Sequence, residues 1–411
     1  MTFRTTEPLQ PRPYVLTNKI QPYEWGSRGS LAFIPNLLGI APVPDKAYAE
    51  MWMGAHPGAP STIRLDDADV PLTDVIGQFP EQCLGPRVQQ RFAGKLPFLL
   101  KILSAEKALS IQAHPNKKQA EQLHRYHPEH YPDDNHKPEI AIPLDSLTAL
   151  VGFKSIADLA ATFETYPEIA TFIGDDLPAQ FQPGRTDSAL LKAMFARYIR
   201  NATADPRQLA QTTDALEKRL SISSASLSDE ARLFLEQKRL YDSADVGLIS
   251  IFLLNLVHLR QGQAIFLDAG IPHAYIRGNI VECMANSDNV VRAGLTPKYK
   301  DVATLVDILT YQSGPVPILQ PDEQGDETVY RVPISEFEIR RWRLAAGGRK
   351  VQTNNRSPQI VLITDGRIEL SWKDSVEIHS RGESLFIPAA LHQFSITASE
   401  EATVFNVAAP V

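Results

Sequence analysis

Two residues in the stretch Leu109–Pro115 have the type and spacing of metal ligands. Gln112 and His114 alternate with Ile111 and Ala113, and alternate residues of a β-strand share a face. An amide and an imidazole on one face of a strand could form half of a metal site. A lone strand histidine is more commonly hydrogen-bonded in a core or at a surface, so the residues alone leave both interpretations open.

A second stretch, Asn135–Glu139, places Lys137 two residues before Glu139 and leads into the strand-like segment 140–143. The two side chains are expected on the same side of an extended chain. Taken alone, a plain ion pair is the simpler interpretation. The preceding run resembles a polar loop, and we leave its histidines out of the ligand set: His124, His127, His130 and His136.

The stretch Gly262–Tyr275 has the spacing Gly, five residues, Asp268, one residue, Gly270, two residues, His273. This pattern resembles the second metal-binding motif of the cupin superfamily, with a turn at 268–270 and a return strand beginning at His273. Gln112 and His114 then resemble the paired ligands of the first cupin motif, with Gln replacing one His. A mixed set of amide, carboxylate and imidazole ligands suits zinc with one position open for water or substrate.

The segment that follows, residues 281–302, adds acid–base groups and cations: Glu282, Asp288, Arg292 and Lys298. Carboxylates can transfer protons, and guanidinium or ammonium groups can bind phosphate. The chain carries a formal net charge of −7, so an anionic substrate has to be held by local cations rather than by the overall field.

These runs together resemble the type I phosphomannose isomerase family. The likeness covers most of residues 20–155 and 245–305. It includes Gln112-Ala-His-Pro, His136-Lys-Pro-Glu, Pro272-His-Ala-Tyr, Ser287-Asp-Asn-Val-Val-Arg, Tyr23-Glu-Trp-Gly-Ser and Ala49-Glu-Met-Trp-Met-Gly-Ala-His-Pro. Ile271 and Arg277 depart from the residues expected there, which affects the shape of the loop and the pocket rim but not the metal ligands.

The resemblance implies an aldose–ketose isomerase that interconverts mannose 6-phosphate and fructose 6-phosphate through an enediolate, in the supply of GDP-mannose. It implies one Zn²⁺ per chain, with Gln112, His114, Glu139 and His273 as ligands. Arg292 matches the catalytic arginine, and other active-site positions are matched by Lys137, Glu282 and Asp288. Ser110 and Lys298 match positions associated with the substrate phosphate, and we add Lys101 to them. The proton-transferring base stays open among Glu282, Lys137 and zinc-bound water.

Two other functions use related folds. An iron-dependent cupin oxygenase usually has a ligand set richer in histidine, and the presence of Gln112 in place of a histidine argues against that function. A non-catalytic sugar-binding cupin has no need for Arg292, Lys137 and Glu282 beside a metal. The segment Gly382–His392 repeats the second cupin motif, but no His-x-His pair precedes it, and we interpret that region as structural.

The elements that position these residues are mainly β, with a helical insertion. Apolar residues recur at helical spacing after Ser155, between Leu191 and Tyr198, and over 228–241, whereas segments after 320 alternate as strands around turns such as Asp365-Gly366. We expect cupin-type (jelly-roll) β-barrels plus an α-helical domain. The predicted division is a catalytic β domain over 1–154 and 261–319, a helical domain over 155–260, and a C-terminal β domain over 320–411.

The composition is that of an ordinary globular protein, 43% hydrophobic and 22% charged over 411 residues. We expect no secretory signal, and the apolar run 249–259 is shorter than the roughly 20 residues of a membrane span. No basic block suggests nucleic acid as a partner. Two cysteines, Cys83 and Cys283, are too few for a disulfide framework, so we expect a cytoplasmic protein, acting as a monomer on a phosphosugar.

Overall fold

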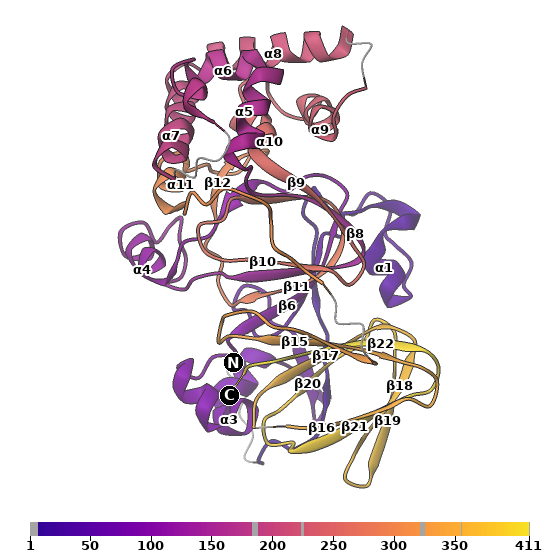
Figure 1. The fold of residues 1–411 in the computed structure, drawn as a ribbon. Coiled ribbons are helices and arrows are strands. Elements are labelled where there is room, and N and C mark those ends of the chain that lie inside the picture. Colours follow the sequence, from indigo (N-terminus) through magenta and orange to yellow (C-terminus); the bar gives the residue numbers. More distant parts are fainter. Residues whose placement is uncertain (1–6, 183–187, 223–225, 321–324, 355, 411) are drawn as a thin grey trace.

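The computed structural model describes residues 7–182, 188–222, 226–320, 325–354 and 356–410. Figure 1 shows three parts stacked along the molecule, with a layer of helices at one end, a large sheet in the middle and a second β region at the other end. The prediction of a strand-rich chain with inserted helices is confirmed.

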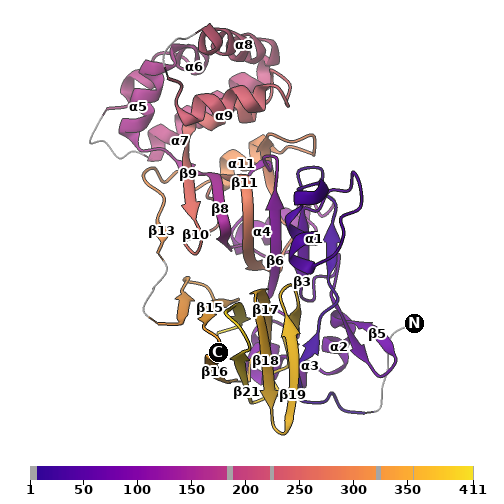
Figure 2. The ribbon, with the colours of Figure 1, turned by 90° about the vertical axis from the view of Figure 1, so that its right-hand side faces the viewer.

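The largest sheet among the described residues is antiparallel and has ten strands. The main path runs β13 (Ile318–Leu319), β10 (Ala264–Leu267), β8 (Glu139–Phe153), β11 (His273–Ala285), β6 (Phe98–Ala105), β3 (Glu50–Met53) and β2 (Lys19–Gln21). The short strands β7 (Ile111–Ala113) and β12 (Val291–Gly294) pair with each other beside β11, and β9 (Leu254–Arg260) pairs with β8. Figure 2 shows β8, β11 and β6 side by side.

The chain turns at 268–270 and begins a new strand at His273, as predicted. Gly270 has φ +75°, and a Cβ there would lie 2.7 Å from the carbonyl oxygen of Ile308, so the turn requires glycine. β10 and β11 do not pair with each other, because β8 lies between them in the sheet. This arrangement makes Glu139, at the start of β8, the cross-strand partner of Leu267 at the end of β10 and of Met284 near the end of β11.

Helices inserted after β8 pack as a layer over one end of the large sheet (Figure 1). They are α5 (Ile156–Thr165), α6 (Pro167–Ile173), α7 (Ser188–Ala204), α8 (Pro206–Ile222), α9 (Asp229–Lys238) and α10 (Val246–Leu253), with a 3-10 turn at Pro178–Gln180. Ser155 and Ser228 cap α5 and α9 by accepting hydrogen bonds from backbone N–H groups two or three positions into the helix. The three predicted helices are confirmed, although α9 ends at Lys238.

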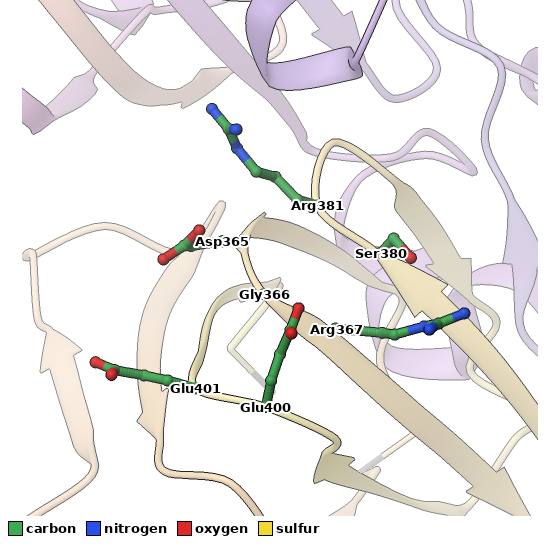
Figure 3. Close-up of a pocket in the computed structure, with 7 residues that line it drawn as sticks. All are labelled: Asp365, Gly366, Arg367, Ser380, Arg381, Glu400 and Glu401. Atoms are coloured by element: carbon green, nitrogen blue, oxygen red, sulfur yellow. The ribbon is translucent and has the colours of Figure 1, made fainter.

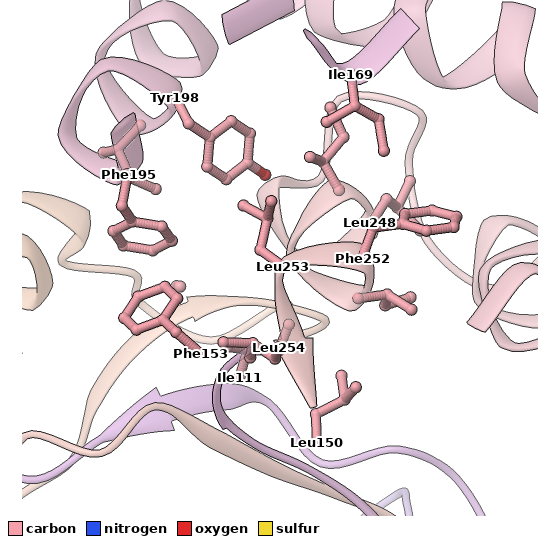
Figure 4. Close-up of a cluster of buried hydrophobic side chains, with 14 of the residues drawn as sticks. Ile111, Leu150, Phe153, Ile169, Phe195, Tyr198, Leu248, Phe252, Leu253 and Leu254 are labelled. Carbon is pink, nitrogen blue, oxygen red and sulfur yellow. The ribbon is translucent and has the colours of Figure 1, made fainter. Parts of the chain in front are cut away.

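The core beneath these helices joins them to the sheet (Figure 4). Phe153, at the end of β8, packs edge-on against Phe195 of α7 with ring centroids 5.2 Å apart, and Leu253 and Leu254 mark the point where α10 continues directly into β9. Because β9 pairs with β8, residues 254–260 are part of the large sheet, although the sequence placed them in the helical domain.

The C-terminal region consists of two further antiparallel sheets that enclose a core of their own. Six strands run in the order β1 (Tyr14–Val15), β20 (Ser384–Ile387), β17 (Gln359–Asp365), β22 (Ala402–Ala408), β15 (Glu338–Leu344) and β14 (Glu327–Tyr330). Four run in the order β16 (Arg349–Thr353), β21 (Gln393–Ala398), β18 (Arg367–Trp372) and β19 (Ser375–Ser380). The predicted Asp365-Gly366 turn carries the chain from one sheet to the other, because β17 and β18 do not pair.

Residues from the N-terminal part of the chain connect the two β regions. β1 joins the C-terminal sheet by pairing with β20, and the backbone N–H of Ala389 donates to the carbonyl of Cys83. One hydrophobic core contains side chains from both regions. The remaining elements are α1 (Phe33–Leu38), α2 (Leu72–Gln78), α3 (Pro80–Arg91), α4 (Lys117–Tyr126), α11 (Val302–Ile308), the 3-10 turn Gly29–Leu31 and the hairpin of β4 (Thr62–Leu65) and β5 (Ala68–Pro71).

None of the described helices has the length and apolar character needed to cross a membrane.

Candidate active site

Three buried side chains from three strands or their ends meet in one cluster. His114 follows β7, Glu139 begins β8 and His273 begins β11. One ligand atom from each lies within 4.8 Å of the others. The Nε2 atoms of His114 and His273 are 3.3 and 3.2 Å from the two carboxylate oxygens of Glu139. The sequence prediction that these distant residues converge is consistent with this geometry.

Hydrogen bonds to the backbone orient both imidazole rings. Nδ1 of His114 donates to the carbonyl of Asn289 at 2.9 Å, and Nδ1 of His273 donates to the carbonyl of Ile271 at 2.9 Å, since a carbonyl can only accept. Burial and the nearby Lys137 lower the pKa of His114 to about 4, so its ring is neutral at pH 7. Its Nε2 lone pair therefore faces a carboxylate oxygen, an arrangement that a cation between them would stabilise.

Gln112 lies beside the cluster on β7. Its cross-strand partner is His273, and its amide Nε2 is 3.4 Å from Nε2 of His273. The amide oxygen accepts a hydrogen bond from Ser110 Oγ at 3.0 Å. Rotation of the terminal torsion would exchange the two amide atoms and present the oxygen to the cluster. The donor set of two imidazoles, one carboxylate and one amide fits zinc.

Lys137 and Tyr275 hold Glu139 in its ionised form. Lys137 Nζ is 2.7 Å from one carboxylate oxygen, and the Tyr275 hydroxyl donates to the other at 3.1 Å. Burial opposes ionisation, but the ammonium of Lys137 keeps the pKa of Glu139 well below its usual value. Lys137 and Glu139 thus form the ion pair expected from their spacing, and that ion pair borders the candidate metal cluster.

A pocket of about 580 Å³ opens next to the cluster, and Gln112 and Lys137 are among the residues that line it. The predicted residues Lys101, Ser110, Asp288, Arg292 and Lys298 line it as well. Burial lowers the pKa of Arg292 and, with the charge of Arg292, that of Lys298. A pair of partly desolvated cations therefore faces this pocket, as an anionic substrate requires.

The surroundings of Lys101 differ from those expected of a phosphate ligand. Lys101 is 5% exposed, and its Nζ lies 3.0 Å from Glu282 and 3.3 Å from Glu50. Its cross-strand neighbours are Glu282 on β11 and Trp52 on β3. Burial opposes the charge, but the two carboxylates raise the pKa of Lys101 above its usual value. Two buried carboxylates around one ammonium leave little positive field for a phosphate.

Glu282 does not line the pocket and is 2% exposed, behind Lys101. Burial raises the pKa of Glu282 above its ordinary value, and Glu139 adds to the shift while Lys101 opposes it. A catalytic role for Glu282 therefore has to pass through Lys101.

Several pocket residues received no role from the sequence. Tyr23, Trp25, Glu50 and Trp52 lie in the two N-terminal family motifs, which could have indicated them, whereas Tyr241 follows the inserted helix α9 and had no signal.

His56, buried at 2% exposure, accepts a hydrogen bond from Gly58 N–H at Nδ1 and so presents Nε2–H to Asp288 at 3.3 Å. Burial opposes ionisation, but His56 holds the pKa of Asp288 below its usual value.

Comparison with known proteins decides the family. The chain is 38% identical to the mannose-6-phosphate isomerase of Mus musculus over 400 residues, covering 92% of this chain and 94% of the mouse protein. This chain belongs to the type I phosphomannose isomerase family. The model of the type I phosphomannose isomerase catalytic domain matches residues 14–156.

Other family members agree with this placement. Mannose-6-phosphate isomerase 2 of Arabidopsis thaliana is 37% identical, covering 90% of this chain and 87% of the plant protein. A mutant of phosphomannose isomerase from Salmonella typhimurium has a TM-score of 0.85 at 30% identity, covering 97% of this chain and 100% of that one. A zinc-bound mannose 6-phosphate isomerase gives a TM-score of 0.84 with the same identity and coverage. The family resemblance seen in the sequence is confirmed.

A different hollow, of about 670 Å³, lies between turns of the C-terminal region and has charged walls. Figure 3 shows that its side chains, among them Arg367, Arg381 and Glu400, point in different directions rather than toward a common centre. It lacks the convergent polar groups of a binding site.

Proposed function

We propose that this chain is a zinc-dependent aldose–ketose isomerase that interconverts mannose 6-phosphate and fructose 6-phosphate through an enediolate. The observation that carries the proposal is the buried His114, Glu139 and His273 cluster, bordered by a pocket that Arg292 and Lys298 line. Family membership and the zinc-bound relative support it. In this proposal Gln112 completes the ligand set.

The isomerisation moves a proton from C2 to C1 and another between O2 and O1, so negative charge develops on both oxygens. Zinc bound at the cluster supplies a Lewis acid that stabilises this charge. In our proposal the guanidinium of Arg292 and the ammonium of Lys137 face the same oxygens and add to that stabilisation. Asp288, fixed by His56, orients the substrate hydroxyl groups from the opposite rim.

The phosphate, in this proposal, binds at Lys298 and Ser110. Lys298 lies with its Nζ 4.8 Å from the centre of the Tyr23 ring, and Ser110 lies two residues from Gln112. We reassign Lys101, which the sequence grouped with the phosphate ligands, because Glu50 and Glu282 already balance its charge. If Glu282 is the base, Lys101 gives one ammonium proton to Glu282 and takes the proton removed from the substrate, so that its own charge is unchanged.

The base therefore remains a choice among Lys137, which lines the pocket, zinc-bound water, and Glu282 acting through Lys101. Glu282→Gln tests the third candidate by the rate at which solvent deuterium enters the substrate. If Glu282 is the base, exchange falls by about 100-fold, in the range for loss of a general base. An unchanged exchange rate would remove Glu282 from the role and leave Lys137 and zinc-bound water.

The wider architecture is part of the proposal. Facing sheets in the C-terminal region support a cupin-type barrel there, and the motif around His273 supports a second one. We divide the chain into a catalytic region of 1–154 and 254–319, a helical domain of 155–253 and a C-terminal region of 320–411. We also propose a monomer in the cytoplasm, serving GDP-mannose biosynthesis. Cys83 and Cys283, both free and buried, are consistent with that compartment.

The deciding experiment is a coupled assay of mannose 6-phosphate isomerisation with and without a chelator. We expect activity that the chelator removes and that Zn²⁺ restores. Measurement of oxygen consumption in the same samples tests the oxygenase alternative. A zinc-loaded protein that binds the phosphosugar without converting it would overturn the proposal in favour of a binding protein.

A further inference from the structure

Asp133 lies in the loop between α4 and β8 and does not line the pocket. Its Oδ1 accepts hydrogen bonds from Asn135 N–H at 2.9 Å, Ser287 Oγ at 2.8 Å and Asn289 Nδ2 at 3.1 Å. Its Oδ2 accepts from the backbone N–H of Asp288 at 2.8 Å. One carboxylate thus binds three consecutive residues of the turn 287–289, more than 150 positions away in the sequence.

The two residues of the turn 287–289 that bind Asp133 through their side chains are buried. Ser287 is 2% exposed and Asn289 is fully buried. The Asn289 amide also donates to the backbone carbonyls of Asp133 and Asn135, at 2.6 and 2.9 Å. These bonds fix the position of the Asn289 backbone, because they hold its side chain and both preceding residues against one loop.

The backbone carbonyl of Asn289 is the group that accepts the Nδ1 hydrogen of His114. A histidine ligand binds through one ring nitrogen, and the partner of the other nitrogen sets the tautomer and the ring orientation. The path from Asp133 to the cluster therefore has three links: the carboxylate, the turn and the imidazole of His114.

Asp133 and the neighbouring Asp134 bind different kinds of partner. Asp134 pairs with Lys117 at 3.6 Å on the surface. Within the described residues, no Lys or Arg forms an ion pair with Asp133, and its recorded partners are neutral donors. A carboxylate that accepts several N–H and O–H bonds makes charge-assisted contacts stronger than neutral ones, which suits a clamp on a turn.

We propose that Asp133 is a positioning residue that orients the metal ligand His114 through the turn 287–289. The inference rests on the proposed function, because it assumes that His114 binds zinc. Asp133 does not touch the substrate. Its effect is to keep Nε2 of His114 directed at Glu139, so that the cluster is preformed before zinc binds.

Asp133→Asn tests the proposal. An amide can keep its oxygen toward Ser287 and Asn289, but its NH₂ group then faces the N–H of Asp288 and that bond is lost. Outer-shell partners typically change metal affinity 10- to 100-fold, so we expect Zn²⁺ affinity, measured by competition with a chelator, to fall by about 10-fold. The absorption spectrum of the Co²⁺-substituted protein is expected to change as well. Asp134→Asn, the matched control, is expected to leave both unchanged.

Ser287→Ala gives a milder second variant in case Asp133→Asn does not fold. It removes the hydroxyl's bonds to Asp133 and Asn135 and the acceptor of the Asn289 backbone N–H, and we expect a decrease of about 3-fold in Zn²⁺ affinity. Folded variants that bind Zn²⁺ like the parent would overturn this inference alone. Failure of the parent protein to bind Zn²⁺ at all would instead overturn the proposed function.

Discussion

Each β region carries a segment that begins with glycine and leads through a turn to a histidine, Gly262–His273 and Gly382–His392, but only the first builds a ligand cluster around that histidine. His273 is 1% exposed and meets Glu139 and Gln112 from neighbouring strands and Tyr275 from its own strand. His392, at the matching position, is exposed beside a pocket of about 640 Å³ lined also by Arg349 and Lys373. In the C-terminal region no second imidazole or carboxylate within the described residues completes a three-ligand group.

The difference shows that a motif on one strand places a single histidine, and that the other ligands have to come from the neighbouring strands. β7 and the end of β8 lie on either side of His273 in the large sheet, where Gln112 and Val151 are its cross-strand partners, and Glu139 at the start of β8 supplies the carboxylate. The turn before His392 instead contacts the N-terminal part of the chain, where Ala389 and Ala390 donate to the carbonyls of Cys83 and Gln82. The C-terminal copy of the motif therefore contributes to packing.

The largest expected effect comes from the two histidines. His273→Ala removes a ligand and leaves Glu139 without one imidazole partner, so we expect bound zinc to be lost and kcat/KM to fall by at least about 100-fold. His392→Ala is expected to retain full zinc content and activity. Metal analysis after dialysis and the coupled assay measure both. A loss of zinc in His392→Ala would break the contrast between the regions.

The cations near each histidine give the second test. In the proposed mechanism Arg292 faces the developing oxyanion, so we expect Arg292→Ala to lower kcat by about 100-fold. Arg349→Ala, beside His392, is the control and should not change kcat. Equal and small decreases of kcat in the two variants would argue that Arg292 does not stabilise the transition state.

Lys298→Ala is expected to act on binding rather than on turnover. Loss of a phosphate contact should raise KM for mannose 6-phosphate by about 10-fold with little change in kcat. Lys373→Ala in the C-terminal pocket serves as the control. An unchanged KM in Lys298→Ala would remove this lysine from the phosphate site.

The smallest effect concerns the hydrogen bond that joins the two regions. His136 donates from Nε2 to Glu336 at 2.7 Å. Burial opposes ionisation, but His136 holds the pKa of Glu336 below its usual value. A carboxylate with a depressed folded pKa stabilises the protein above its unfolded pKa, and this stabilisation disappears as pH falls through the folded pKa.

We therefore expect Glu336→Gln to lower the free energy of unfolding by about 1 kcal/mol at pH 7. The difference from the parent should shrink below pH 4.5, the ordinary pKa of glutamate. Thermal unfolding of both proteins across this range measures the effect. A difference that stays constant down to the lowest pH would show that the charge of Glu336 makes no contribution.

The sequence predicted the parts of this site that depend on motifs, and not the parts that depend on pairing between distant strands. The candidate ligands and Arg292 were found because each lies in a short run with a fixed spacing. The two carboxylates that surround Lys101 were not predicted, because they are brought there by the register that puts β6 between β3 and β11. Tyr241 was missed for the same reason, because nothing local indicates what it will face, whereas His56 lies in the second N-terminal family motif, which could have indicated it.

The same distinction applies to the fold. Apolar spacing predicted α5 and α9, because that signal is local. The separation of β17 and β18 into different sheets was not predicted, because an Asp-Gly turn fixes the reversal of the chain but not its partners.

The core shared by the two β regions has a consequence for how the chain is made. Phe405 and Val407 of β22 pack in the same cluster as Leu100 and Ile102 of β6. A ribosome delivers β6 some 300 residues before β22, so the sheet that holds the candidate ligands waits with part of its apolar surface uncovered. That apolar surface is therefore covered only near the end of translation.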